Sequence, residues 1–134
     1  MISITGLKNK VWKEFSRYIK VRDANKDGYV NCCTCKKIMH WKESQAGHFV
    51  CGRKNAVLFD DRIVHAQCVT CNLYGGGEQY KYSLFMMEKG YTREELEELN
   101  NLKFATKKFS REELNEMHKT YKEEADKIQM EKGI

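Results

Sequence analysis

Two pairs of cysteines in the sequence have the spacing of a metal site. Cys32 and Cys35 form one C-x-x-C pair, Cys68 and Cys71 form the other, and 32 residues separate the two pairs. A C-x-x-C turn presents two thiolates to one ion, and two such turns complete a tetrahedral site of four sulfurs. The spacing therefore predicts one structural Zn²⁺ per chain.

The remaining cysteines, Cys33 and Cys51, are interpreted as spare thiols, because C-x-C is a less usual metal-binding spacing than C-x-x-C. A disulfide oxidoreductase is the competing interpretation of a C-x-x-C pair. The βαβ pattern expected around such a motif is missing here, so zinc is the favoured interpretation.

Residues that could perform hydrolysis lie between the cysteine pairs and just after them. A zinc ion with four sulfur ligands has no open position, so it holds structure and does no chemistry. His48 and His65 each lie in a predicted strand, and Asn72 directly follows the last cysteine. A neutral imidazole beside a divalent ion could take a proton from water, and an asparagine carbonyl is an oxygen ligand that Mg²⁺ accepts. Each histidine taken alone is more often structural, and His40 is interpreted as a surface residue.

The net charge of +5 is unevenly distributed along the chain. Residues 1–31 carry seven Lys and Arg against three acids, residues 32–90 carry eight against five, and residues 91–134 carry nine against eleven. Basic residues in the first two thirds favour a polyanionic partner such as nucleic acid, although an ordinary solvated surface explains the charge equally well.

The sequence has a mean hydropathy of −0.72 and only short apolar runs. No run is long enough to span a membrane, and the first residues lack the pattern of a secretory signal. We therefore expect no membrane association and a cytoplasmic location.

Apolar periodicity predicts a basic amphipathic helix over residues 9–22, followed by a turn at 23–28. Two strands are predicted from their Val, Ile and Phe content, "AGHFVC" (46–51) and "IVHAQC" (63–68), with a loop over 52–61 between them.

Three helices are predicted after the glycine-rich corner at 75–78. The first covers "QYKYSLFMMEKG" (79–90) and ends at Gly90. "TREE" and "SREE" fit capping boxes that open a short helix at Thr92 and a long helix at Ser110. The long helix packs its apolar stripe on the core or on a partner helix. That stripe consists of Leu114, Met117, Tyr121, Ala125 and Ile128.

The order of these motifs resembles that of zinc-stapled HNH (ββα-metal) nucleases, with a spacing similar to that of phage endonuclease VII. That resemblance implies that His48 is the general base and that Asn72 is a ligand of a catalytic Mg²⁺ or Mn²⁺ ion. The sequence also resembles the NinG/Rap family of lambdoid phage recombination proteins over roughly residues 12–125. This match rests on "FSRYIKVRDA", C-x-T-C, "HWKESQAGHF", "LFDDRIVHAQCVTCN" and "KGYTREELEEL".

The expected fold class is α+β, with a small zinc-stapled ββα-metal core. Three parts are expected: an N-terminal basic amphipathic helix and turn (1–28), the HNH-like core (29–90), and a C-terminal helical appendage (91–134).

The sequence departs from the family pattern at the expected metal ligands. Gly47 stands where HNH sites have an aspartate directly before the histidine, and Gln45 stands where NinG-like chains often have one. Ile63 and Glu78 each replace an asparagine that is common in the family.

The second ligand of the catalytic ion is therefore left open among three candidates. His48 could itself be a ligand, which would leave His65 as the base; Glu78 or the Asp60/Asp61 pair could serve instead.

The resemblance implies a phage-encoded, metal-dependent endonuclease that cuts branched recombination intermediates such as Holliday junctions and D-loops. Branched DNA is the expected partner, and a homodimer through the C-terminal helix would present two sites to it. The alternative is a zinc-stapled module that binds DNA or a recombination protein without cutting. The basic residues expected to contact phosphates are Arg53, Lys54 and Arg62 beside the site, and Lys13, Arg17 and Lys20 on the first helix.

Overall fold

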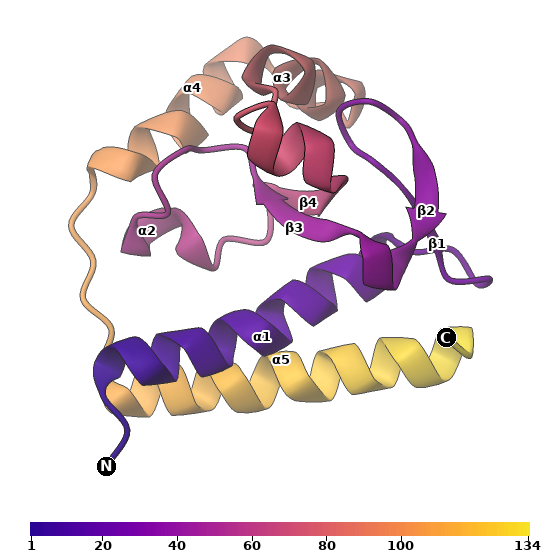
Figure 1. The fold of residues 1–134 in the computed structure, drawn as a ribbon. Coiled ribbons are helices and arrows are strands. Elements are labelled where there is room, and N and C mark those ends of the chain that lie inside the picture. The colour runs from indigo at the N-terminus through magenta and orange to yellow at the C-terminus, as the bar shows by residue number, and fades with distance from the viewer.

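Two antiparallel strands, β3 and β4, form the centre of the fold, with helices on both sides (Figure 1). The computed structural model describes residues 1–134. Its elements in chain order are α1 (Ile4–Asp23), β1 (Tyr29–Asn31), β2 (Ile38–His40), the 3₁₀ turn η1 (Trp41–Glu43), β3 (Gln45–His48), α2 (Asn55–Leu58), β4 (Val64–Gln67), the π-helical turn η2 (Thr70–Tyr74), α3 (Gln79–Glu88), α4 (Arg93–Asn101), the 3₁₀ turn η3 (Leu102–Phe104) and α5 (Arg111–Lys132).

Helix α1 begins five residues before the predicted start at residue 9. The Ser3 hydroxyl accepts a hydrogen bond from the Gly6 N–H at 3.0 Å, which caps the first turn. The apolar stripe also extends one turn further toward the N-terminus than the periodicity predicted. Its fully or nearly buried members are Leu7, Val11, Phe15 and Ile19.

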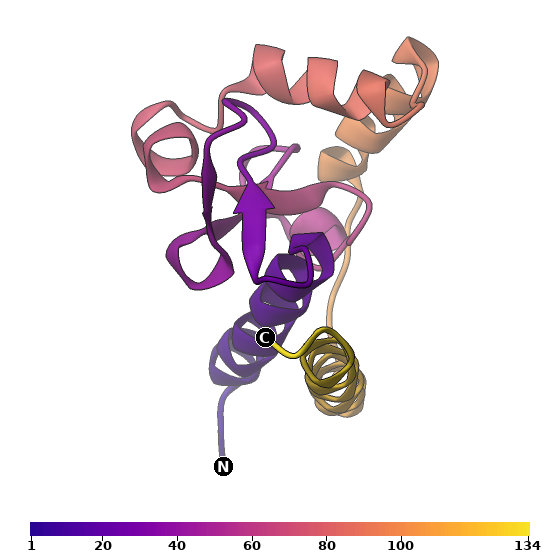
Figure 2. The ribbon, with the colours of Figure 1, turned by 90° about the vertical axis from the view of Figure 1, so that its right-hand side faces the viewer.

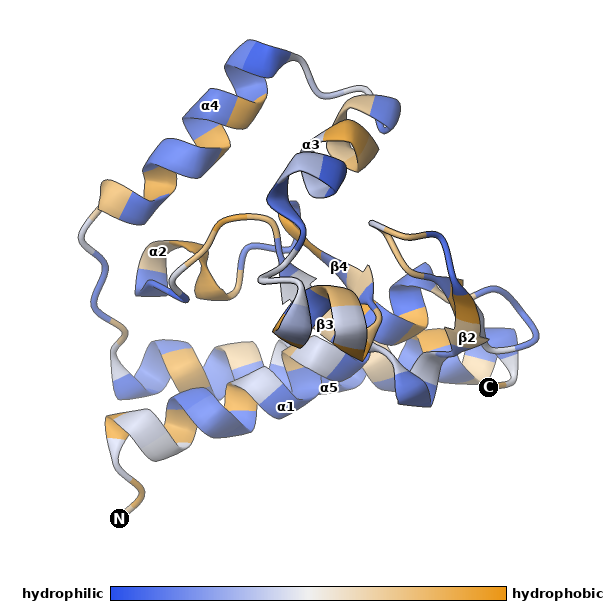
Figure 3. Cartoon of the chain, turned by 45° about the horizontal axis from the view of Figure 1, so that its top comes forward, coloured by the Kyte–Doolittle hydropathy of each residue, from blue (hydrophilic) through white to orange (hydrophobic).

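Helix α5 lies alongside α1, which settles where its apolar stripe packs (Figure 2). Leu114 and Ala125 are fully buried, and the Tyr121 ring meets the Phe15 ring edge-on at 5.0 Å. Apolar residues recur along both helices in Figure 3. The stripe therefore covers α1 of the same chain, and a homodimer through α5 would have to use the other face of this helix.

Near the end of α5, the Lys132 ammonium closes the C-terminal end of α1. Its Nζ donates hydrogen bonds to the carbonyl oxygens of Val21, Arg22 and Ala24 at 2.6–3.1 Å. The last carbonyls of a helix have no partner within the helix, so this contact joins the two helix ends electrostatically as well.

Strands β1 and β2 form a small ribbon that the sequence pattern did not predict as strands. Tyr29 pairs with His40 and Asn31 with Ile38, so the first cysteine pair lies in the connection between them. Three-residue strands are too short to show an alternating pattern. Lys36, in the same connection, has a left-handed φ of 68°.

The predicted strand pair is confirmed as β3 and β4, both shorter than expected. Gly47 lies opposite His65, and His48 lies opposite Val64. The loop between them contains the short helix α2, whose Val57 and Leu58 are buried in the core. The strands end early because the chain turns into that loop.

The capping boxes at the starts of α4 and α5 are both confirmed. The Thr92 hydroxyl accepts from the Glu95 N–H while the Glu95 carboxylate accepts from the Thr92 N–H, and Ser110 with Glu113 repeats the pattern. Helix α3 is also confirmed, with Tyr82 and Met86 buried.

The α+β class is confirmed by this mixture of helices and two small sheets. One core cluster of 18 buried residues includes side chains from all three predicted parts of the chain. The division at residues 28 and 90 stays a prediction. None of the helices has an apolar stretch long enough to cross a membrane.

Candidate functional site

The four predicted zinc ligands meet at one point. The ligand atoms of Cys32, Cys35, Cys68 and Cys71 all lie within 4.8 Å of one another, and the Cys35 and Cys68 sulfurs are 3.8 Å apart. A tetrahedral zinc ion with Zn–S bonds of about 2.3 Å needs sulfurs about 3.8 Å apart. The donor chemistry and the spacing therefore fit a closed structural Zn²⁺ site.

Each cysteine pair is shaped by the same local turn. The Cys35 N–H points to the Cys32 sulfur at 3.5 Å, and the Cys71 N–H points to the Cys68 sulfur at 3.4 Å. The first pair follows β1 and the second follows β4. A backbone bond from the Cys33 N–H to the Ala66 carbonyl at 3.0 Å holds these two segments together.

The pKa values of the thiols show that a bound cation is needed to keep all four cysteines as thiolates. Burial raises the pKa of Cys32, but hydrogen bonds from the Cys35 N–H and the Thr34 hydroxyl outweigh it and lower that pKa to about 6. Burial raises the pKa of Cys71 to about 12. Without a metal the cluster cannot hold four thiolates at neutral pH, whereas Zn²⁺ binds thiolates and displaces their protons.

His48 is held so that one of its ring nitrogens is a free base. Its Nε2 lies 3.0 Å from the Leu58 carbonyl oxygen, which can only accept, so Nε2 carries the proton and Nδ1 keeps its lone pair. The ring stacks on Trp12 at 5.2 Å between ring centroids, and the Arg53 guanidinium lies 4.3 Å from the centroid of the same Trp12 ring. Burial lowers the pKa of His48, so the imidazole is neutral at neutral pH.

A hollow of about 260 Å³ brings three of the predicted site residues together. His48, Arg53 and Asn72 all line it, with Gly76 and Gly77 on the side of the glycine-rich corner. Asn72 reaches this place from the π-helical turn η2, a rare conformation that is common at functional sites. We call this space the His48 hollow.

Gln45, one of the departures from the expected metal ligands, is a neighbour of Asn72. The Asn72 Nδ2 donates to the Gln45 Oε1 at 2.8 Å, so the side chain next to Asn72 is a neutral amide. Glu78 does not line the His48 hollow. The four cysteines are the only group of three or more His, Cys, Asp or Glu side chains positioned to share a metal ion.

Gly47 has no room for a side chain. A Cβ at this position would lie 2.0 Å from the Gln67 Oε1, because Gln67 is completely buried against the glycine. The Gln67 Nε2 donates to the Thr34 hydroxyl at 3.0 Å and to the Gly77 carbonyl at 2.9 Å. Gln67 thus links the cysteine cluster to the wall of the His48 hollow, a role that its type and position in the sequence did not indicate.

His65 lies on the opposite face of the strand pair from His48. It shares a face with Gly47, its partner across the strands, and side chains alternate along a strand. The single Tyr82 hydroxyl proton is donated to the Gly47 carbonyl at 2.7 Å, so the His65 Nδ1 donates to the Tyr82 oxygen at 3.1 Å. Burial lowers the pKa of His65 to about 4.

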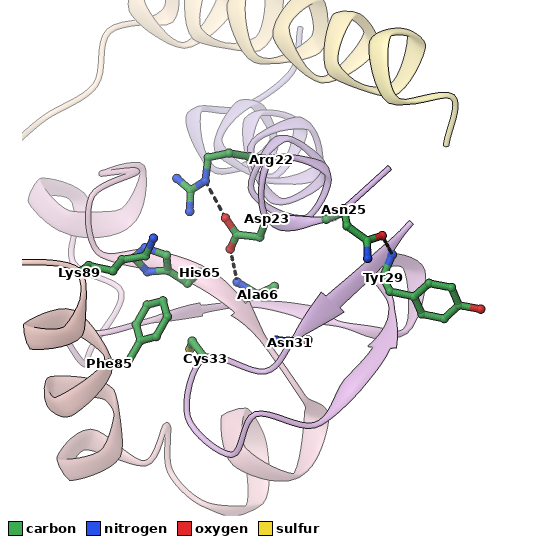
Figure 4. A pocket seen from close by; sticks show the side chains of 11 residues that line it. Arg22, Asp23, Asn25, Tyr29, Asn31, Cys33, His65, Ala66, Phe85 and Lys89 are labelled. Carbon is green, nitrogen blue, oxygen red and sulfur yellow. Dashed lines mark hydrogen bonds and ion pairs between the residues drawn. The ribbon is translucent and has the colours of Figure 1, made fainter. Parts of the chain in front are cut away.

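Arg22 and Asp23 line the space beside His65 and already have partners (Figure 4). Lys89 lines the same space and lies over the Phe85 ring. Arg22 pairs with Asp23 at 2.8 Å and donates to the Asp61 and Val64 carbonyl oxygens. His65 does not line the His48 hollow, so the two histidines predicted as candidate bases do not share one site.

The six basic residues expected to contact phosphates differ in exposure and in whether they already pair with a carboxylate. Lys13, Arg53 and Lys54 are exposed and have no acidic partner. Arg17 pairs with Glu14 at 2.7 Å and with Asp126 at 2.8 Å. Arg62 pairs with Asp60 at 2.6 Å, and burial lowers the pKa of Lys20, which lies over the Trp41 ring.

Comparison with known proteins identifies the family. The family described as Bacteriophage Lambda NinG protein matches residues 4–131, nearly the whole chain. The chain therefore belongs to the NinG family, a phage family related to recombination. No curated protein and no solved structure matches it significantly.

Replacing one cluster cysteine should remove both metal and fold. We expect Cys68→Ser to contain no zinc and to lose its cooperative thermal transition, because a structural zinc site contributes folding free energy directly. Zinc content by elemental analysis and melting by circular dichroism measure the two effects. The exposed thiol variant Cys51→Ser is the control and should match the wild type. A folded, zinc-free Cys68→Ser protein would contradict the role of the cluster.

Acid should destabilise the protein through His65. Its folded pKa of about 4 lies below the unfolded value, so protons bind the unfolded chain preferentially and stability falls as the pH drops below about 6.5. From pH 7 to pH 5 we expect His65 to account for a loss of about 2 kcal/mol in the free energy of unfolding. Urea denaturation of zinc-loaded wild type and His65→Asn at both pH values isolates this part. Parallel losses in the two proteins would contradict the assignment.

Proposed function

We propose that this NinG-family protein is a metal-dependent, structure-selective endonuclease that acts on branched DNA. The observation that carries the proposal is the His48 hollow, in which a neutral imidazole with a free Nδ1 lies with Asn72 and Arg53. Hydrolysis of a phosphodiester needs a base for the attacking water and positive charge for the phosphate.

His48 would act as the general base in this reaction. Its Nε2–H stays bonded to the Leu58 carbonyl, which fixes the ring plane and leaves Nδ1 to accept the proton of water. The stacked Trp12 holds the ring from one side. The depressed pKa keeps the base unprotonated, and a proton taken up at Nδ1 gives an imidazolium that can return it to solvent.

Arg53 and Lys54 would receive the DNA backbone beside this base. Both are exposed, and Arg53 is anchored over Trp12. Lys13, exposed on α1, is a further cation without an acidic partner. Arg17 and Arg62 would have to release their carboxylates first, so we give them a smaller part in phosphate binding.

A Mg²⁺ or Mn²⁺ ion would supply Lewis acidity at the scissile phosphate. Asn72, which lines the hollow, offers it an amide oxygen, a hard ligand of the kind these ions accept. The Gln45 amide oxygen lies next to Asn72 and accepts its Nδ2 hydrogen bond, but Gln45 itself does not line the hollow. Glu78 remains a candidate ligand only if it moves toward the hollow, since it does not line it.

A non-catalytic DNA-binding module is the second candidate. One observation favours it: no Asp or Glu lines the hollow together with His48 and Asn72. Such a module would use the exposed basic residues for salt-dependent binding without turnover.

Loss of the base should abolish cutting and leave binding intact. We expect His48→Ala to lower metal-dependent cleavage of an end-labelled four-way junction by about 10²- to 10⁴-fold. Zinc content and junction affinity should stay near those of the wild type. His118→Ala on α5 is the matched control, and linear duplex of the same arms tests selectivity. Binding without cutting by zinc-loaded wild type, in either metal, would favour the non-catalytic module.

Adding a carboxylate beside Asn72 should strengthen the catalytic metal site. Gln45→Glu has nearly the same shape as glutamine and keeps an acceptor for the Asn72 amide. Because ligand charge sets affinity for hard cations, the Mn²⁺ concentration for half-maximal cleavage should fall by about tenfold. Calorimetric titration with Mn²⁺ gives a readout independent of cleavage. Unchanged Mn²⁺ affinity would place the ion elsewhere.

A further inference from the structure

Two tyrosines on the segment that forms one wall of the His48 hollow project their side chains into solvent. Tyr74 is 84% exposed and Tyr80 is 76% exposed, more than any other tyrosine in the chain. Neither ring contacts another aromatic ring, whereas Tyr29, the next most exposed, meets the His40 ring edge-on. The fold makes no use of these two rings.

Their place in the chain ties both rings to the hollow. Tyr74 directly follows Leu73, and Tyr80 directly follows Gln79; Leu73 and Gln79 both line the hollow. Gly76 and Gly77, which lie between them in the chain, supply another part of its wall. The two rings therefore stand on either side of the glycine-rich corner, on η2 and at the start of α3.

The surroundings of these rings combine flat apolar surface with positive charge. Leu73 adds a third exposed apolar side chain, 60% accessible. Lys81 follows Tyr80, and the free cations Arg53 and Lys54 lie in the segment that forms another wall of the hollow. Glu78 is the only acid between residues 69 and 87. A ligand with flat apolar faces on a negative backbone matches this surface.

We propose that Tyr74 and Tyr80 stack on unpaired bases of a DNA strand whose phosphate enters the His48 hollow. The position of that phosphate rests on the proposed function. Bases inside a duplex already stack on one another, whereas bases at a branch point or in a single-stranded arm have free faces. The two rings therefore select branched or splayed DNA over continuous duplex.

The test measures base stacking and affinity without added Mg²⁺ or Mn²⁺. Zinc-loaded full-length protein is titrated into splayed DNA that carries 2-aminopurine at the first unpaired position, and into duplex of the same sequence. We expect fluorescence quenching by the wild type. Tyr74→Ala and Tyr80→Ala should each bind splayed DNA roughly tenfold more weakly, with duplex affinity within about twofold of wild type.

Three matched variants separate stacking from other effects. Tyr74→Phe and Tyr80→Phe keep the ring and should keep the affinity. Tyr29→Ala removes an exposed tyrosine on β1 whose neighbours in the chain do not line the hollow, and should bind like the wild type. Equal losses for Ala and Phe variants, or equal losses on splayed and duplex DNA, would overturn the proposal.

The outcomes also distinguish this inference from the proposed nuclease. Quenching that depends on the two rings, with no cleavage in Mg²⁺ or Mn²⁺, supports the stacking surface and rejects the nuclease. Cleavage by the Ala variants with an unchanged preference for branches rejects the stacking surface alone. Self-association that Tyr74→Ala abolishes in sedimentation experiments would assign these rings to a second copy and overturn the proposal.

Discussion

Four sulfur atoms within 4.8 Å of one another set the constraint on which the middle of this protein depends. The segments that carry them are the β1–β2 ribbon, strand β4 and the π-helical turn η2. None of these short elements buries enough apolar surface to be stable alone. A shared Zn²⁺ ion would fix both cysteine turns at once. Hydrogen bonds from Cys32 through Thr34 and Gln67 connect the cluster to the Gly77 carbonyl in the glycine-rich corner. The wall of the His48 hollow therefore depends on the cluster.

The helices were the most predictable part of the fold because their signals are local. Side chains at Thr92 and Ser110 satisfy free N–H groups within three residues, and the α5 stripe repeats with the period of a helix. The β1–β2 ribbon was missed for the opposite reason. Its strands are stabilised by pairing and by the cysteine turn between them, and neither effect leaves a pattern in three residues.

The candidate site could be predicted in part, and strand register explains the limit. His48 and Asn72 do share one hollow, as the motif order indicated. His65, equally plausible in the sequence, faces away, because a histidine opposite Gly47 must point to the other side from a histidine at residue 48. The roles of Trp12 and Gln45 could not be read from spacing, since they come from an earlier helix and from the start of β3.

The pairing of α1 with α5 has a consequence for synthesis. The apolar face of α1 is complete once residue 23 has been made, but the side of it that α5 covers waits for residues 111–132. At roughly 5–20 residues per second, this face stays open for about ten seconds while the middle of the chain emerges. During that interval the side of the Phe15 ring that Tyr121 later covers is open to chaperones and to other chains. The yield of folded protein in a cell therefore depends on translation speed and on chaperone supply as well as on the stability of the finished fold.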